Sequence, residues 1–310
     1  MPGQPTLDQF RGCLIGLALG DALGGPYEGL PDGVIDGLVM SGVVLDDPAE
    51  ATIHYTDDTQ MMIGLAEELA DRGEVEEDAL LARFAANYNP DRGYGAGMRR
   101  LLGAILDGNA RPGMALDLFP GGSLGNGAAM RVAPVGICFA GDLDRVAEQA
   151  GRSARPTHAH PIGIDGARLL ALGVALAARG GPFIRRDFFG ELARRAETDE
   201  FRWQIEAAGH LRDSDSLGPF GNGLEAHRSV TTALGLFAAS PDDYPGTIRR
   251  AIAQGGDTDT LAAMAGALAG ARLGLGAIPG GPLARVEDGP RGRAYILGLA
   301  DRLYQRHRPC

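Results

Sequence analysis

Apolar residues recur at helical spacing along almost the whole chain. Twelve segments carry them at positions i, i+3 and i+4 or in long runs of Ala and Leu, which places apolar side chains on one face of a helix. The predicted helices span residues 7–20, 59–72, 76–88, 96–107, 141–151, 161–179, 186–196, 201–211, 224–239, 243–254, 259–274 and 290–306. Residues 33–45 are the only stretch rich in Val and Ile, and strands do not alternate with helices as in a Rossmann sheet. The pattern predicts an all-α fold.

Glycine, with 48 of 310 residues, is about twice as frequent as the usual ~7%. Short glycine clusters separate the predicted helices, and other glycines lie inside apolar runs such as LAAMAGALAGARLGLG. Small residues at a spacing of three and four suit closely packed, buried helices. The length is near the upper limit of ~250–300 residues for one core, and no clear linker divides the chain. We expect one domain over residues 1–310, although two are possible, with residues 212–223 as its most exposed loop.

Composition narrows the classes of function. The net charge of -11 argues against a nucleic-acid partner, which usually meets a basic face. The sequence has no run of about 18 uncharged apolar residues, so we predict no membrane span. The first residues do not resemble a secretory signal. Cys13, Cys138 and Cys310 are far apart, so neither a disulfide framework nor a zinc site is expected, and we predict buried structural thiols at Cys13 and Cys138. A cytoplasmic location and, without a heptad seam, a monomer are the corresponding expectations.

The chain contains no lysine, so all 29 basic residues are arginine. A Walker A phosphate loop needs its lysine, and a Schiff-base mechanism needs an amine. The sequence therefore excludes both kinds of chemistry.

Two acidic clusters each precede a strongly apolar helix. The first is Thr56-Asp57-Asp58-Thr59 and the second is Asp257-Thr258-Asp259-Thr260. Asp and Thr are also preferred helix N-caps, so either cluster alone is explained about as well by capping as by metal binding. One cap needs only one such residue, however, and packed carboxylates repel one another unless a cation lies between them. Together the clusters favour a site for Mg²⁺, Mn²⁺ or Ca²⁺, because their oxygen ligands suit hard cations.

A glycine-rich segment, Pro120 to Arg131 (PGGSLGNGAAMR), precedes another apolar run. Successive glycines can leave backbone N–H groups free to bind an anion such as a diphosphate. Taken alone, the segment is better explained as a tight loop with glycines at positive φ.

The ordered motifs of the chain resemble the ADP-ribosylglycohydrolase family, which includes the dinitrogenase-reductase-activating glycohydrolases. The resemblance spans residue 10 to about residue 305, and the TDDT and GGDTDT pair is its most specific part. The motifs are Gly12–Asp21 (GCLIGLALGD), Tyr27-Glu28, Tyr55–Thr59 (YTDDT), Arg92–Gly97 (RGYGAG), Gly125–Arg131 (GNGAAMR), Thr157-His158, Gly221–Gly223 (GNG) and Gly255–Thr260 (GGDTDT).

The resemblance implies a compact orthogonal bundle of many helices, with the active site at helix N-termini and glycine-rich loops. It implies two Mg²⁺ or Mn²⁺ ions, with Thr56, Asp57 and Asp58 matching the ligands of one ion. Asp257, Asp259 and Thr260 match those of the other, and Asp259 is expected to bridge. The implied activity is hydrolysis of the bond between ADP-ribose and a protein side chain or small acceptor.

Within the family, the chain is most similar to the subgroup that acts on serine-linked ADP-ribose, poly(ADP-ribose) and O-acetyl-ADP-ribose. Glu28 supports this, because that subgroup carries a Glu on a loop near the metals. Glu28 is then the candidate acid/base residue and a part-time metal ligand, with Asp58 the second candidate catalytic residue. From the sequence alone, Glu28 would be interpreted as an exposed loop charge.

The resemblance also implies where the substrate binds. Gly122, Ser123, Gly125, Asn126 and Gly127 match the loop that holds the diphosphate and nearby ribose, and His158 matches a histidine of the phosphate region. Gly95 and Gly97 should border the ribose, and Leu224 should line the site. Leu124 stands where the subgroup usually has an aromatic residue, so adenine stacking is expected on Phe119. This departure counts against poly(ADP-ribose) more than against single ADP-ribose units.

Three alternatives to this interpretation are open. Hydrolysis of arginine-linked ADP-ribose would use the same site. A different two-metal hydrolase, such as a nucleotide phosphoesterase, would share the carboxylates and phosphate loop but release phosphate or AMP. A non-catalytic ADP-ribose binder would bind the ligand without turnover.

Overall fold

The computed structural model describes residues 4–30, 34–35, 51–109 and 114–307. Within these residues no strand is formed, and two isolated backbone bridges join Ile53 with Val286 and Gly125 with Glu225. The predicted all-α fold is therefore confirmed. Most of the Val- and Ile-rich segment at 33–45 lies outside the described residues, as does Cys310.

All twelve predicted helices are present, with ends that differ by a few residues. Among the helices whose bounds the structure describes, three more, of five or six residues, are not predicted from the sequence, because one or two turns offer too few positions for a helical repeat. The α-helices are α1 (Leu7–Gly24), α4 (Asp57–Arg72), α5 (Glu77–Asn87), α6 (Ala96–Leu106), α7 (Met114–Leu118), α8 (Ala133–Cys138), α9 (Leu143–Ala154), α10 (Pro161–Ala177), α11 (Arg185–Arg195), α12 (Asp199–Gly209), α13 (Ala226–Ala239), α14 (Tyr244–Ala253), α15 (Thr258–Leu273), α16 (Gly280–Arg285) and α17 (Arg293–His307). The 3₁₀ turns are η1 (Gly25–Tyr27), η2 (Pro90–Arg92), η3 (Asn126–Ala128), η4 (Gly218–Phe220) and η5 (Leu275–Ala277).

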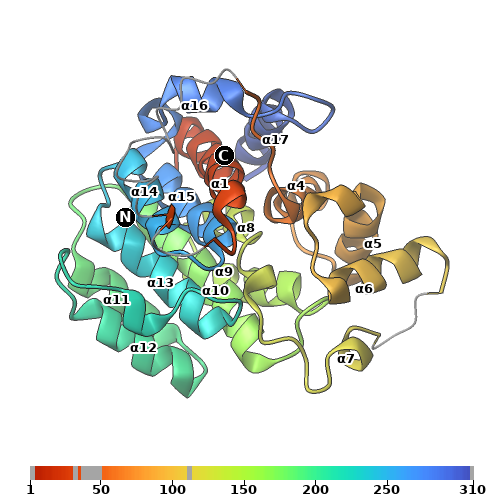
Figure 1. Ribbon diagram of the computed structural model, residues 1–310, viewed down its shortest axis with the longest axis horizontal. Coiled ribbons are helices and arrows are strands. Elements are labelled where there is room, and N and C mark those ends of the chain that lie inside the picture. Colours follow the sequence, from red (N-terminus) through yellow and green to blue (C-terminus); the bar gives the residue numbers. More distant parts are fainter. Residues whose placement is uncertain (1–3, 31–33, 36–50, 110–113, 308–310) are drawn as a thin grey trace.

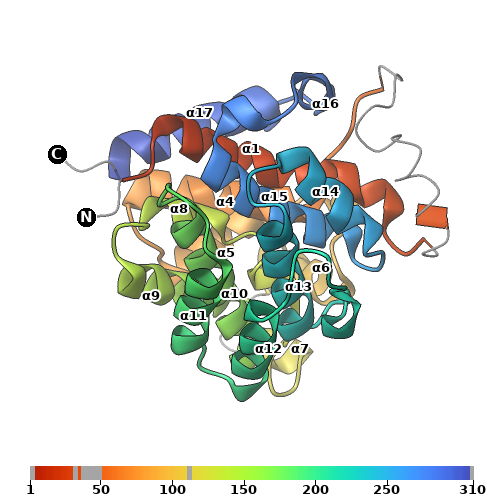
Figure 2. The ribbon, with the colours of Figure 1, turned by 90° about the vertical axis from the view of Figure 1, so that its left-hand side faces the viewer.

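Helices α1 and α15 form a closely packed antiparallel pair in the interior (Figures 1 and 2). Their contact follows glycines every four residues along α1. A Cβ atom added to Gly12 would lie 2.4 Å from the carbonyl oxygen of Gly270, and one added to Gly16 would lie 2.4 Å from that of Gly266. The two backbones therefore touch without side chains between them, as the small-residue spacing predicted. The pairing also sets the C-terminal end of α1 beside the N-terminal end of α15.

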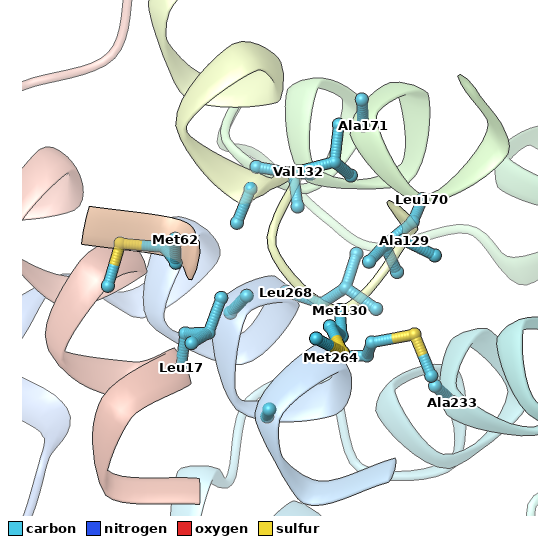
Figure 3. Packing of buried hydrophobic residues seen from close by; sticks show 14 of the residues in the cluster. Leu17, Met62, Ala129, Met130, Val132, Leu170, Ala171, Ala233, Met264 and Leu268 are labelled. Carbon is cyan, nitrogen blue, oxygen red and sulfur yellow. The ribbon is translucent and has the colours of Figure 1, made fainter. Parts of the chain in front are cut away.

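The other helices surround this pair. Helix α15 also packs against α13 and α14, α10 packs against α8, α9 and α13, and α4 packs against α5 and α17. In Figure 1, α4, α5 and α6 lie on one side of α1 and α11 to α13 lie on the other. The close view in Figure 3 shows Leu17, Met62, Leu170, Ala233 and Leu268 meeting in one apolar interior. The cluster of buried apolar side chains extends from α1 to α17.

Several smaller sequence predictions concern exposure. No helix among the described residues combines the length and apolar character that a membrane crossing requires. Cys13 and Cys138 are buried free thiols, as expected. The predicted exposed loop is exposed from Arg212 to Ser216, whereas Leu217 and Phe220 are buried and attach its second half to the core.

Candidate active site

The two acidic clusters meet at one cavity of about 320 Å³. The N-terminus of α4 contributes the first cluster, and the N-terminus of α15 contributes the second. Every residue assigned to metal binding lines the cavity: Glu28, Thr56, Asp57, Asp58, Asp257, Asp259 and Thr260. Clusters about 200 residues apart in the chain thus line the same cavity. They meet because α1 packs along α15 and also contacts the start of α4 through Asp21.

The start of α4 is held by two residues, neither of which is Asp57 or Asp58. The Thr56 hydroxyl accepts a hydrogen bond from the backbone N–H of Asp58 at 3.4 Å, as an N-cap. From α1, the buried Asp21 carboxylate accepts the N–H of Thr56 at 2.9 Å and both the N–H and the hydroxyl of Thr59 at 3.0 and 2.5 Å. The N–H groups of Thr56, Asp58 and Thr59 are therefore capped without the other two carboxylates. Asp58 is buried, and its Oδ2 has no hydrogen-bond partner among the described residues.

A turn before α15 presents the second cluster. Asp257 occupies the N-cap position but makes no side-chain capping bond. Its N–H donates to the carbonyl of Asn222 at 3.0 Å, and its Oδ2 accepts a hydrogen bond from the Asn126 side chain at 2.6 Å. Gly256 has a φ of 70°, and a Cβ there would lie 2.4 Å from the Asn222 carbonyl oxygen. The GNG and GGDTDT motifs thus form one tight junction, which fixes the position of Asp257.

Glu28 reaches this cluster from the segment after α1. The N–H of Gly29 donates to the carbonyl of Gly256 at 3.2 Å, and the Thr258 hydroxyl donates to the carbonyl of Gly24 at 2.9 Å. These bonds tie the segment to the start of α15. Carboxylate oxygens of Glu28, Asp257 and Asp259 lie within 4.8 Å of one another, with Glu28 exposed and both aspartates buried.

Burial and mutual repulsion raise the pKa values of these carboxyl groups. Burial and the Asp21 charge raise the pKa of Asp57 to about 7, and burial and the Asp257 charge raise the pKa of Asp259 to about 9. Burial and then the Asp259 charge raise the pKa of Asp58 well above its usual value. The pKa of Glu28 is also raised, by desolvation and by Asp257. Carboxyl groups in such a cluster hold either protons or a cation, and the oxygen-only donor set fits a hard divalent ion.

A second wall of the cavity comes from the glycine-rich segment. Ser123, Gly125, Asn126 and Gly127 line it, together with His158, Phe119, Gly95 and Leu224. Asn126 is buried, and its side-chain amide is bonded to Asp257 and to the Ser229 hydroxyl. It therefore joins this wall to the acidic cluster.

Three residues expected at the site do not line the cavity: Gly97, Gly122 and Leu124. A Cβ on Gly97 would lie 2.0 Å from Cζ of Phe119, so Gly97 provides the surface on which that ring rests. Gly122 has a φ of 87°, and a Cβ there would lie 2.2 Å from the backbone N of His160, as expected of a tight turn. The Leu124 side chain is 38% exposed, next to the bridge between Gly125 and Glu225.

Comparison with known proteins agrees with the motifs. A sequence model described as ADP-ribosylglycohydrolase matches residues 2–310. The chain belongs to the ADP-ribosylglycohydrolase family. ADP-ribosylhydrolase ARH3 of Homo sapiens is 35% identical, over 88% of this chain and 88% of its own, and that of Danio rerio is 34% identical, over 88% and 85%. A solved structure titled ADP-ribosylglycohydrolase-related protein complex matches with a TM-score of 0.73 and 28% identity, over 97% of this chain and 99% of its own.

Three more residues of the site have contacts that the sequence pattern does not predict. Arg131 and Thr157 line the cavity, and Asp21 lies behind the start of α4. All three stand within the family motifs quoted above, so the signal was present. Some of their contacts are local, but Arg131 also bonds Ser153 and Thr157, 22 and 26 positions away, and Asp21 bonds Thr59, 38 positions away. Helical periodicity does not predict these long-range contacts.

Proposed function

We propose that this protein hydrolyses the glycosidic bond that joins ADP-ribose to an acceptor and releases ADP-ribose. The observation that carries the proposal is the meeting of Glu28, Asp257 and Asp259 at a cavity that the glycine-rich segment also lines. Hydrolysis of a glycosidic bond needs an acid/base group, and the glycine-rich segment would bind the diphosphate of ADP-ribose. Membership of the ADP-ribosylglycohydrolase family supports the same activity.

The proposal includes two Mg²⁺ or Mn²⁺ ions. Thr56, Asp57 and Asp58 would hold one, and Asp257, Asp259 and Thr260 would hold the other, with Glu28 as an additional ligand before substrate enters. Asp58 Oδ2, buried without a hydrogen-bond partner among the described residues, is the atom that most needs such a counter-charge. When bound, the ions would supply positive charge that orients the ribose hydroxyls next to the anomeric carbon.

The chain's own residues would carry the proton transfers. Glu28 is exposed at the cavity, and its raised pKa keeps its proton to a higher pH than usual. It would protonate the leaving oxygen as the bond to the anomeric carbon breaks, and then accept a proton from the attacking water. The neighbouring carboxylates, Asp58 among them, would stabilise the positive charge that develops on the sugar.

The substrate would lie across the cavity. Ser123 and the Gly125–Gly127 segment would hold the diphosphate with His158, Gly95 would border the ribose, and Phe119 with Leu224 would contact the adenine end. All of these residues line the cavity. Because Leu124 replaces an aromatic residue and lies outside this lining, single ADP-ribose units are favoured over poly(ADP-ribose).

The preferred acceptor would be a protein serine or an O-acetyl group. The position of Glu28 beside Asp257 and Asp259 supports it, since the loop glutamate distinguishes the subgroup that the sequence most resembles. A cytoplasmic monomer acting on such substrates stays a prediction from the sequence.

Turnover with different acceptors tests the proposal. Serine- and arginine-linked ADP-ribosyl peptides and O-acetyl-ADP-ribose would be incubated with the protein, with Mg²⁺ or with EDTA, and analysed by mass spectrometry. We expect free ADP-ribose from the serine peptide and from O-acetyl-ADP-ribose, with Mg²⁺ only. Release from the arginine peptide alone would overturn the acceptor assignment. Release of AMP would indicate a phosphoesterase, and binding without release would indicate a non-catalytic binder.

A further inference from the structure

Arg131 is a fully buried cation on the wall of the cavity. No carboxylate among the described residues forms an ion pair with it. Its guanidinium instead donates to neutral acceptors: the carbonyl of Gly127 at 2.8 Å, the carbonyl of Ser153 at 2.9 Å and the hydroxyl of Thr157 at 2.7 Å. The face of Phe84, whose ring centre lies 4.8 Å from Cζ, covers it.

Such an arrangement is costly unless the charge has a use. Burying an ionised group is expensive, and hydrogen bonds to neutral acceptors offset only part of the cost. Burial lowers the pKa of Arg131 to about 9, which still leaves the group charged near pH 7. A methionine of similar size would pack against Phe84 without this penalty. The positive charge beneath the glycine-rich segment is therefore a feature that packing does not explain.

Arg131 is the first member of a short hydrogen-bond chain. The Thr157 hydroxyl oxygen accepts from Arg131 and lies 2.8 Å from Nδ1 of His158, compared with 3.3 Å from the Ala154 carbonyl. The single hydroxyl proton is best used in the shorter contact, so Thr157 donates to Nδ1. A neutral imidazole that accepts at Nδ1 carries its proton on Nε2.

The surroundings of His158 keep the ring neutral and orient it. Burial and the nearby Arg131 charge lower the pKa of His158 to about 3. The Nε2 edge faces the glycine-rich segment, because a Cβ added to Gly127 would lie 3.3 Å from Nε2 and one added to Gly125 would lie 3.8 Å from it. The ring thus presents an N–H donor to the same wall of the cavity.

We propose that Arg131 is a positioning residue, which through Thr157 holds His158 as an Nε2–H donor toward the Gly125–Gly127 segment. The identity of the anion that receives this donor, the diphosphate of ADP-ribose, rests on the proposed function. Arg131 also fixes the Gly127 carbonyl and adds a positive charge behind the segment. Its role is to favour diphosphate binding, not to take part in bond cleavage.

The tautomer of His158 can be measured without any substrate. Nitrogen-15 NMR of the histidine rings in the free protein, with His158 assigned by a His158→Gln variant, should show the Nε2–H form from pH 5 to pH 8. In Thr157→Val, the Nδ1 resonance should move and an Nδ1–H form should appear, because Nδ1 has lost its donor. Thr157→Ser, which keeps the hydroxyl, should retain the wild-type signals. An Nδ1–H form in the wild type, or unchanged signals in Thr157→Val, would overturn the proposal.

Affinity for ADP-ribose provides the second measurement. By calorimetry, Thr157→Val and Arg131→Met should each bind ADP-ribose at least ~10-fold more weakly, and in turnover assays KM should rise more than kcat falls. Thr247→Val is the matched control, because Thr247 is another fully buried threonine that bonds the Ser240 carbonyl, outside the cavity. It should lose stability but keep ADP-ribose affinity. Equal affinity losses in Thr247→Val and Thr157→Val would reduce the effect to general destabilisation and contradict the proposal. Absence of turnover in the wild type would count against the proposed function and leave the NMR result to decide the role of Arg131.

Discussion

At the scale of single residues, Glu28 differs from the other acidic groups of the site. It is exposed, whereas Asp58, Asp257 and Asp259 are buried, and it belongs to no helix. A carboxyl group that exchanges a proton with the substrate must be accessible to it. A carboxylate whose function is to supply negative charge can be buried. The pKa of Glu28 is raised by desolvation and by Asp257, which favours the proton-donating form of the carboxyl group more than in an ordinary glutamate.

Glu28→Gln should therefore remove most of the turnover. The amide keeps the shape but carries no transferable proton, and loss of a general acid typically costs about 10²- to 10⁴-fold in rate. The measurement is kcat for ADP-ribose release from the preferred acceptor. The control is Glu148→Gln, a matched change at an exposed position of α9, which should leave kcat unaltered. Full turnover in Glu28→Gln would exclude the acid/base role.

Asp21 is the residue on which the geometry of the first acidic cluster depends. Its carboxylate accepts the N–H groups of Thr56 and Thr59 and the Thr59 hydroxyl, although burial raises its own pKa. Asp21→Asn places an amide N–H group opposite these donors. We expect a loss of about 1–3 kcal/mol in the free energy of unfolding, together with weaker Mg²⁺ binding. Denaturant titration would measure the loss of stability, and calorimetry would measure the affinity for Mg²⁺. Normal Mg²⁺ affinity in the variant would show that Asp21 does not support the metal site.

At the scale of elements, the contact between α1 and α15 decides whether the site forms. Both helices are apolar nearly all round and buried, so their amphipathic pattern does not specify how they pair. The pairing is specified by the glycines at positions 12, 16, 20 and 24, because this face of α1 allows the two backbones to touch. The same contact aligns Gly24 with Thr258 and so places Glu28 near Asp257.

Gly16→Ala should be strongly destabilising for this reason. The added methyl group would lie 2.4 Å from the Gly266 carbonyl oxygen, so the two helices must separate. Overpacking of this kind costs about 1–3 kcal/mol, and separation should also reduce metal affinity. Gly298→Ala is the matched control in α17, where a Cβ meets no atom within 4 Å. That change should stabilise the protein by roughly 0.5–1 kcal/mol, since alanine is the better helix former. Urea denaturation of the two variants would contradict the packing argument if both changed in the same direction.

At the scale of the whole molecule, the acidic cluster links stability to pH and to divalent ions. In the metal-free fold, the pKa of Asp57 is about 7 and that of Asp259 about 9, against 3.8 in an unfolded chain. The folded state therefore binds more protons than the unfolded state between these values, so stability falls as the pH rises through them. Below pH 3.8 both states are protonated, and these groups cost no stability there.

Mg²⁺ should reverse this loss. Thermal unfolding in EDTA should give a lower Tm at pH 8.5 than at pH 6, and saturating Mg²⁺ should raise the Tm more at pH 8.5, because ions compete with protons for the carboxylates. Asp259→Asn should weaken both the pH dependence and the response to Mg²⁺. An equal Mg²⁺ response at both pH values would show that these carboxylates do not form the binding site.

Local sequence patterns determined the helices and the chemical character of the site. The repeat of apolar residues is a property of neighbouring positions, so the long helices were predicted to within a few residues, whereas the short α7, α8 and α16 were not. The two acidic clusters are also local, and each stands at a helix start in the structure. Their carboxylates predict a hard cation from the sequence alone.

Tertiary structure alone decided which of these residues meet and which only support the others. Three contacts join residues that helical periodicity does not relate. Asp21 caps α4, Gly97 leaves room for the ring of Phe119, and Arg131 is linked through a hydrogen-bond chain to His158. The physical reason is that a local pattern sets conformation and burial, whereas contacts across the fold depend on which buried helices pack against each other. Here the packing of α1 against α15 follows from backbone contact along the glycines of α1. That contact turns two separate helix ends into one site.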